Sequence, residues 1–142
     1  MKMKKNVLYW IATGLFAGML TLSGAIAITH QPTAVTGYAH LGYPEYFLTL
    51  LGTAKLAGVI VLLAPRFPRL KEWAYAGFAI NLVSATFSHV ASHDAASHAV
   101  TPMVLLALML VSWRLRPAGR VMAFAPREAE RVVASATPAH AA

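Results

Sequence analysis

The chain contains no cysteine, and this absence excludes several kinds of chemistry for the 142-residue protein. Disulfide bonds, cysteine-ligated iron–sulfur clusters and covalent c-type haem all require cysteine side chains. Sulfur transfer through a persulfide requires a cysteine as well. None of these reactions or centres can be built from this chain alone.

Charged residues are also scarce, and acidic residues most of all. Only 12% of the residues are charged, with five Asp and Glu against twelve Lys and Arg, whereas a soluble domain carries about 25%. Hydrophobic residues make up 58% of the chain, and the mean hydropathy is +0.58. This composition is typical of a membrane protein, and the length suits one small helical domain. Motifs for nucleotide binding or hydrolysis are missing too.

The basic residues gather at the ends of long apolar stretches. Eleven of the twelve fall in three clusters: Lys2, Lys4 and Lys5; Arg66, Arg69 and Lys71; Arg114, Arg116, Arg120, Arg127 and Arg131. The positive-inside rule places clusters of this kind on the cytoplasmic side of a membrane. Although the net charge is +7, no surface with interleaved aromatic and basic residues accompanies it, so no nucleic-acid partner is expected.

The sequence predicts an all-α fold: an integral membrane four-helix bundle with both termini in the cytoplasm. In this prediction, residues 1–116 form a four-span membrane domain with spans at about 7–29, 46–64, 73–90 and 99–115. A short surface helix, opened by Pro32, is expected between spans one and two. Residues 117–142 are expected to form a mostly disordered cytoplasmic tail.

Two points about these spans need an argument: whether the first span is removed as a signal peptide, and where the fourth span begins. Ala25-Ile26-Ala27 resembles a signal-peptidase site, but the apolar run Val7–Thr29 is longer than the roughly 7–15 residues of a signal peptide core. We therefore expect the first span to be retained. A fourth helix from Thr101 to Leu115 would rise only about 22 Å against a core of roughly 30 Å. That helix is therefore expected to begin before Pro102 and to kink there.

Lys55 is the exception to the clustering, since it falls near the middle of the second span. An ionisable residue at that depth costs several kcal/mol unless it faces the protein interior. Gly52 and Gly58 flank it and would let a second helix approach closely. We expect Lys55 to make an interior polar contact; the alternative is a long side chain that reaches a membrane surface.

Small residues elsewhere predict further close packing of helices. Gly14 and Gly18 form a small-x-x-x-small pair on the first span, and Gly77 lies on the third. Asn81, near the middle of the third span, is the expected partner of Lys55. Ser88 and His89 continue the polar stripe of Asn81 toward the outer surface. The stripe has two open interpretations, hydrogen bonding between helices or a path for a ligand or proton.

Polar residues of the predicted outer side form the remaining candidates. Glu45 lies at the outer mouth of the second span, as a helix N-terminal carboxylate or as a partner for a proton, a quinone oxygen or Lys55. Five of the six histidines fall on this side: His30, His40, His89, His93 and His98. His89 and His93 have the i, i+4 spacing of two ligands on one helix, with Asp94 beside them. The signal is weak, so no metal is predicted.

The run LLAPRFPRLKEWAYAGF at residues 62–78 is distinctive. Together with LGYP at residues 41–44, the group of Gly52, Lys55 and Gly58, and the pair Ser88-His89, it resembles the DoxX-like family of small bacterial membrane proteins. The resemblance covers about residues 7–115. It implies a four-helix membrane bundle in the bacterial plasma (inner) membrane.

The family takes its name from a subunit associated with a thiosulfate:quinone oxidoreductase. The resemblance therefore implies a place beside quinone chemistry, with quinone as the one cofactor it suggests. It marks five positions: Lys55, Glu72, Trp73, Asn81 and His89. Many members have an acidic residue at the position of Asn81, and an amide there can neither pair ionically with Lys55 nor relay a proton as a carboxylate would.

Three functions follow as hypotheses. The first is a quinone-interacting or accessory subunit of a membrane oxidoreductase, with a membrane or peripheral redox subunit as partner. The second is a non-catalytic membrane scaffold or assembly factor, in which Gly14 and Gly18 contact a partner helix or a second copy in a homo-oligomer. The third is a small transporter, suggested by the polar stripe alone. All three place the chain in the lipid bilayer, and no catalytic motif identifies an enzyme.

Overall fold

A computed structural model of the chain describes residues 2–121, all of whose regular structure is helical. The elements in chain order are α1 (Lys2–Ile28), α2 (Pro32–His40), α3 (Tyr46–Leu63), α4 (Pro68–Ala91), α5 (Ala96–Arg114) and the short 3-10 helix η1 (Ala118–Arg120). The predicted all-α fold is thus confirmed over these residues. Most of the predicted tail, residues 122–142, lies outside the described part of the chain.

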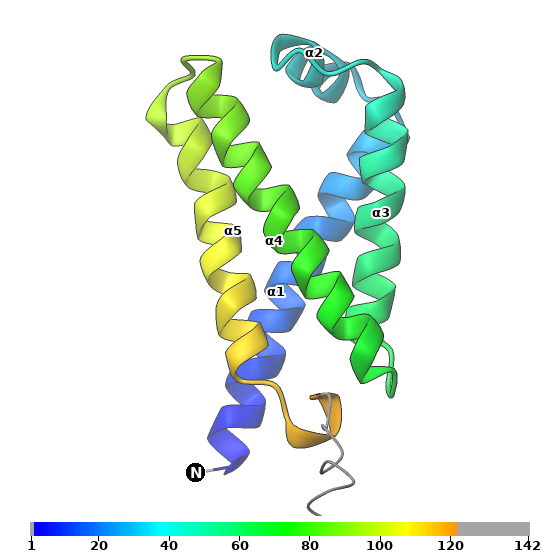
Figure 1. Ribbon diagram of the computed structural model, residues 1–142, viewed down its shortest axis with the longest axis vertical. Helices are drawn as coiled ribbons and strands as arrows, with labels where there is room; N and C mark the ends of the chain where they lie inside the picture. Colours follow the sequence, from blue (N-terminus) through cyan, green and yellow to red (C-terminus); the bar gives the residue numbers. More distant parts are fainter. Residues whose placement is uncertain (1, 122–142) are drawn as a thin grey trace, which may run out of the picture.

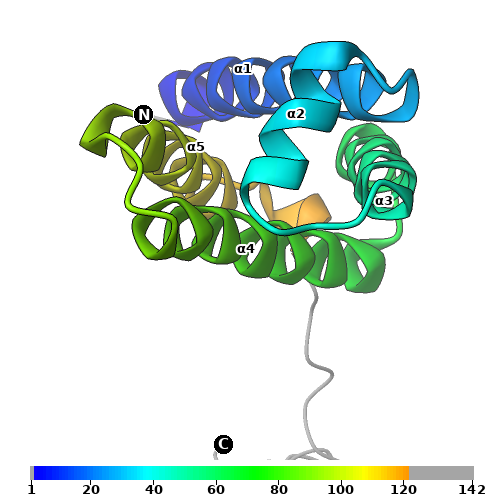
Figure 2. The same cartoon turned by 90° about the horizontal axis from the view of Figure 1, so that it is seen from above.

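The four long helices enclose a common core, with each packing against two others. α1 contacts α3 and α5, and α4 contacts the same two helices (Figure 1). Aromatic and aliphatic side chains from all four fill the centre, where the rings of Phe16 and Phe78 meet edge to face at 5.3 Å. The short helix α2 lies across one end of this bundle (Figure 2).

Three helices are long and apolar enough to cross a membrane: α1 within Met3–Ile28, α3 over Tyr46–Leu63 and α5 over Ala96–Arg114. α4 has 24 residues, which is sufficient length. However, polar residues such as Asn81 and His89 lower its hydropathy, and it is not among the three. The membrane character of the chain is therefore supported, whereas the predicted four crossings stay a prediction.

The helix boundaries refine the predicted spans. α5 begins at Ala96 and contains Pro102 in its interior, so the prediction that this helix starts before the proline is confirmed. α4 begins at Pro68, five residues before the predicted start, because proline fits the first turn, where its missing N–H costs nothing. α2 confirms the predicted short helix between the first two spans.

Close packing of helices occurs at two of the five predicted glycines. A Cβ on Gly52 would lie 2.7 Å from Ile28 Cγ1 and 2.9 Å from the backbone oxygen of Gly24. A Cβ on Gly58 would lie 2.5 Å from the ring of Phe78. α3 therefore approaches α1 and α4 at positions where no side chain fits.

The other three predicted glycines do not pack against another helix in this structure. Nothing lies within 4 Å of a Cβ built on Gly14, Gly18 or Gly77. The predicted close packing is therefore not formed within the described chain, and contact of Gly14 and Gly18 with a partner helix stays a prediction. The reason is the rotation of each helix: the face of α1 with Gly14 and Gly18 points away from the bundle, and Gly77 borders a cavity.

Two basic residues bind the backbone at the C-terminal end of α3, which lies at the same end of the bundle as the start of the chain (Figure 1). Lys71 is fully buried, and its Nζ donates to the backbone oxygens of Val61, at 2.7 Å, and Ala64. Arg120 Nη1 donates to the oxygen of Leu62 at 2.9 Å. Because the last carbonyls of a helix lack partners within it, these side chains act as caps.

Candidate functional site

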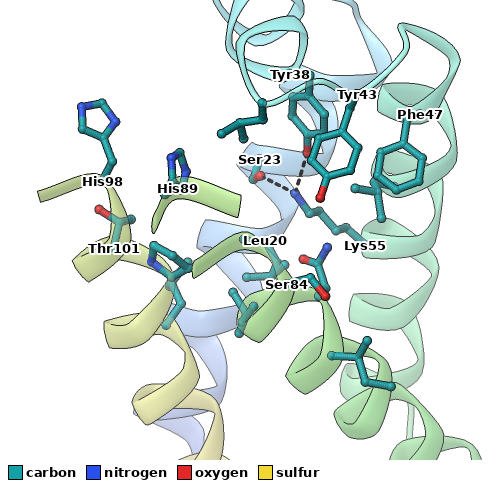
Figure 3. A pocket seen from close by; sticks show the side chains of 18 of the residues that line it. Leu20, Ser23, Tyr38, Tyr43, Phe47, Lys55, Ser84, His89, His98 and Thr101 are labelled. Atoms are coloured by element: carbon teal, nitrogen blue, oxygen red, sulfur yellow. Dashed lines mark hydrogen bonds between the residues drawn. The ribbon is translucent and has the colours of Figure 1, made fainter. Parts of the chain in front are cut away.

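A cavity of about 630 Å³ opens into the half of the bundle that α2 covers. Figure 3 shows its labelled lining side chains. Apolar groups such as Leu20, Phe47 and Leu105 form most of the wall. The polar groups in the wall come from five helices and the loop before α3: Ser23, Tyr38, Tyr43, Lys55, Asn81, Ser84, His89, His98 and Thr101. We call this space the Lys55 cavity.

Lys55 enters the cavity from the middle of α3. Its Nζ donates a hydrogen bond of 3.0 Å to Ser23 Oγ on α1 and a longer one of 3.5 Å to Tyr38 OH on α2, as the dashed lines in Figure 3 mark. The interior polar contact expected from the sequence is therefore present. Burial raises the pKa of Tyr38, so its hydroxyl stays protonated near neutral pH.

Asn81 is not the hydrogen-bonding partner of Lys55, contrary to the expectation. It lines the same cavity from α4, but among residues 2–121 its amide makes no side-chain hydrogen bond. Lys55 and Asn81 line the same cavity, but the sequence did not reveal the partners Ser23 and Tyr38. No spacing or motif in the sequence links Ser23 or Tyr38 to Lys55.

Ser88 is hydrogen-bonded to the loop before α3. Its hydroxyl donates to Ser84 O at 2.9 Å, which leaves its oxygen to accept the hydrogen bond of 2.7 Å from Tyr43 OH. The Tyr43 ring stacks on Phe47 with 4.8 Å between ring centroids. This contact fixes one edge of the cavity mouth.

Histidine and aspartate side chains meet at the same mouth. His89 Nδ1 lies 2.7 Å from Asp94 Oδ2, and His40 Nε2 lies 2.6 Å from Asp94 Oδ1. Hydrogen bonds from His89 and then from His40 lower the pKa of Asp94 below its ordinary value. The ring of His98 lies 5.7 Å from that of His89, centroid to centroid.

The i, i+4 spacing of His89 and His93, a weak signal in the sequence, does not place the two side chains on one helical face. α4 ends at Ala91, so His93 lies in the following turn with a φ of 56° and does not continue the helical face. The residues that join His89 are His40 and His98, which come from α2 and α5 and share no helical spacing with it.

Glu45 stands apart from the Lys55 cavity. It directly precedes α3 and makes no capping hydrogen bond with its side chain. Its Oε1 lies 3.0 Å from His30 Nδ1, and the other ring nitrogen of His30 lies 2.8 Å from Thr49 Oγ1. Of the two readings, the carboxylate at a helix N-terminus agrees with this position; a contact with Lys55 does not.

Comparison with known proteins adds one finding. A family model described as the DoxX-like family matches residues 11–112, more than half of the chain. The chain belongs to the DoxX-like family. No match was found among curated proteins or among solved structures. The matched range includes every residue that lines the Lys55 cavity.

The positions marked by the DoxX-like resemblance fall in two places. Lys55, Asn81 and His89 line the cavity. Glu72 and Trp73 lie at the start of α4, toward the opposite end of the bundle. The marked positions of this DoxX-like protein therefore form two groups, one in the cavity and one toward the opposite end of the bundle.

Glu72 holds the start of α4 against the end of α5. Arg116 Nη1 donates to Glu72 Oε1 at 2.7 Å, and Trp113 Nε1 donates to Oε2 at 3.2 Å. The hydrogen bond from Arg116 is the main cause that lowers the pKa of Glu72. Trp73 is 80% exposed and contributes no such contact. At this end of the DoxX-like chain, Glu72 therefore links the start of α4 to the end of α5.

Proposed function

We propose that this DoxX-like protein crosses the membrane four times and binds the head group of a quinone in the Lys55 cavity, as an accessory subunit of a membrane oxidoreductase. The observation that carries the proposal is the cavity itself: an apolar wall of suitable size, with a few polar groups gathered on one side. Small-molecule sites in proteins have this character and volumes of about 300–1,000 Å³.

The polar groups suit a ring that carries carbonyl oxygens. Such oxygens only accept hydrogen bonds, so the site must supply donors. The Lys55 ammonium has three N–H bonds, and the two hydroxyl contacts to Ser23 and Tyr38 leave one for a ligand. The amide of Asn81, on the facing helix, offers a second donor. The apolar remainder of the wall suits the ring faces and the start of an isoprenoid tail.

A fourth crossing by α4 is consistent with its place in the bundle. α4 packs between α3 and α5, both of which are candidate spans. Its 24 residues correspond to about 36 Å. The polar residues Asn81 and His89 face the cavity rather than lipid, which is where a membrane helix tolerates them.

The orientation follows from the basic clusters. Three parts of the chain lie at one end of the bundle: the start of α1, the turn between α3 and α4, and the end of α5 (Figure 1). Basic residues occur in or beside each of these parts. The positive-inside rule therefore favours this end as the cytoplasmic one, in a bacterial plasma membrane. A reporter fused after Leu115 should then be active only in the cytoplasm, and activity confined to the outside would contradict four crossings.

The binding proposal is tested with the full chain purified in detergent. Titration with a short-chain ubiquinone analogue should show saturable binding, and Lys55→Met should weaken it by about 10-fold or more, because one charge-assisted hydrogen bond contributes about 1.5–3 kcal/mol. Lys4→Met is the matched control, since Lys4 is exposed near the start of α1 and distant from the cavity. Unchanged binding in Lys55→Met and Asn81→Leu would show that the site assignment is wrong.

A scaffold function is the second candidate, and the open face of α1 favours it. Gly14 and Gly18 have no neighbour within 4 Å of a built Cβ, and small residues on an exposed face allow a partner helix to approach in lipid. The partner would be another membrane subunit or a second copy of this chain. In that case Gly14→Leu should disrupt the purified complex, whereas Lys55→Met should leave it intact.

A further inference from the structure

Three side chains of types that commonly bind metal ions lie close together where α4 turns into α5. His89 lies in the last turn of α4, Asp94 in the connecting turn, and His98 in the first turn of α5. One potential ligand atom from each lies within 4.8 Å of the other two. The three residues span ten positions of the chain, so the turn itself brings them together.

Backbone hydrogen bonds fix the shape of this turn. The N–H of Ser92 donates to Ser88 O at 2.9 Å and that of Asp94 to His89 O at 3.0 Å, while His98 N donates to Ala95 O at 2.9 Å. The carboxylate is therefore held beside the His89 ring by the main chain as well as by the side-chain contact. Such preorganisation reduces the conformational entropy that metal binding would otherwise cost.

His40 supports the same carboxylate from outside the turn. Its Nε2 lies 2.6 Å from Asp94 Oδ1, whereas His89 lies against Oδ2. Ligating carboxylates are commonly oriented in this way by a second residue that does not touch the metal. His40 belongs to α2, so the contact also attaches the surface helix to the turn between α4 and α5.

We propose that His89, Asp94 and His98 bind a divalent transition-metal ion, with zinc as the ion that suits this ligand set. Two imidazoles and one carboxylate match zinc and its neighbours, whereas magnesium and calcium prefer oxygen ligands alone. Three protein ligands leave a fourth position open. The site lies at the mouth of the Lys55 cavity, because His89 and His98 line both.

Few basic residues lie on the segments that form this end. No Lys or Arg occurs between residues 72 and 113, and Lys55 is the one such residue between residues 6 and 65; it lines the same cavity, where its Nζ donates to Ser23 and Tyr38. In a tetrahedral zinc site with bonds of about 2.0–2.2 Å, ligand atoms lie roughly 3.3 Å apart. The present spacing of up to 4.8 Å is wider, and the exposed side chain of His98 is the one of the three that is least confined. The inference does not depend on which ligand occupies the cavity.

Calorimetric titration of the full-length protein with zinc chloride tests the site, using an affinity tag free of histidine. We expect one zinc ion per chain. His40→Ala removes a residue that supports a ligand and should lower the affinity for zinc by ~10–100-fold. His98→Ala and Asp94→Asn each remove a proposed ligand and should lower the affinity by at least as much. His98 is exposed and makes no side-chain hydrogen bond among residues 2–121, so we expect His98→Ala to fold, and circular dichroism of the variant checks this.

The matched control replaces His93, a histidine of the same turn that is not a member of the cluster, and should bind zinc as the parent chain does. Cobalt provides a second readout, since a tetrahedral cobalt complex absorbs visible light and His98→Ala should abolish that spectrum. The absence of saturable 1:1 binding, or an equal loss in the control and in His98→Ala, would overturn the proposal.

Discussion

Replacement of Gly52 by alanine tests the close approach of α1 and α3 with a single added methyl group. The new Cβ would lie 2.7 Å from Ile28 Cγ1 and 2.9 Å from the backbone oxygen of Gly24. Both distances are well below ordinary van der Waals contact, and the second partner is backbone that cannot rotate away. The two helices must therefore separate, or one must shift along the other.

The expected magnitude follows from two opposing effects. Alanine has the higher intrinsic helix propensity, by about 0.8–1.0 kcal/mol. Overpacking of a close interface costs about 1–3 kcal/mol. Gly18→Ala measures the effect of helix propensity alone, because Gly18 lies in α1 and nothing lies within 4 Å of a Cβ built on it. The free energy of unfolding of Gly52→Ala should therefore be about 1–3 kcal/mol below that of Gly18→Ala.

Unfolding of both variants in detergent by increasing sodium dodecyl sulfate, followed by circular dichroism, measures this difference. Gly18→Ala should be at least as stable as the parent chain. If Gly52→Ala and Gly18→Ala were both at least as stable as the parent chain, α1 and α3 would not approach at Gly52 as the structure describes. A loss in Gly18→Ala equal to that in Gly52→Ala would instead indicate that the face of α1 with Gly18 is packed, as in a homo-oligomer.

Two further changes test polar contacts inside the bundle. Because the pKa of Glu72 is lowered from its ordinary value of 4.5, its ion pair with Arg116 stabilises the fold at neutral pH, and this contribution is lost as the pH falls through the lowered pKa. Glu72→Gln should therefore be less stable than the parent at pH 7, and the difference should shrink as the pH falls below about 4.5; a difference independent of pH would contradict the role of the ion pair. Ser112 bridges the buried hydroxyls of Thr13, at 2.7 Å, and Tyr75, at 2.8 Å. Ser112→Ala should destabilise the fold by about 1–3 kcal/mol, since buried hydroxyls lose their partner, whereas Ser97→Ala, at an exposed position of α5, should change the stability by less than about 0.5 kcal/mol.

The helices themselves were largely predictable, because hydropathy and proline placement are local properties of a chain. The predicted second span at 46–64 and α3 at Tyr46–Leu63 agree almost residue for residue. The start of α5 before Pro102 followed from the length that a span requires. The role of Lys71 was missed, since the sequence shows it only as one member of a basic cluster, whereas the structure buries it as a cap of α3.

The candidate site was predictable in part. The depth of Lys55 in an apolar helix marked it as an interior residue, and the stripe with Asn81 and His89 marked one face of α4. Its partners were not predictable, since Ser23 lies 32 residues away in sequence. The pair of His40 and Asp94 is 54 residues apart, and neither residue stands out until two helices and a turn are folded together.

The sequence by itself thus determined where the helices form, that the chain belongs in a membrane, and that one lysine needs a partner inside the bundle. Hydropathy, charge clusters and breaker residues act over a few neighbouring positions, so they can be read directly from the chain. The tertiary structure decided which glycines are crossed by another helix, which hydroxyls reach Lys55, and which histidines surround Asp94. Those contacts depend on the rotation and crossing of helices, which are set by side-chain packing over the whole bundle rather than by local periodicity.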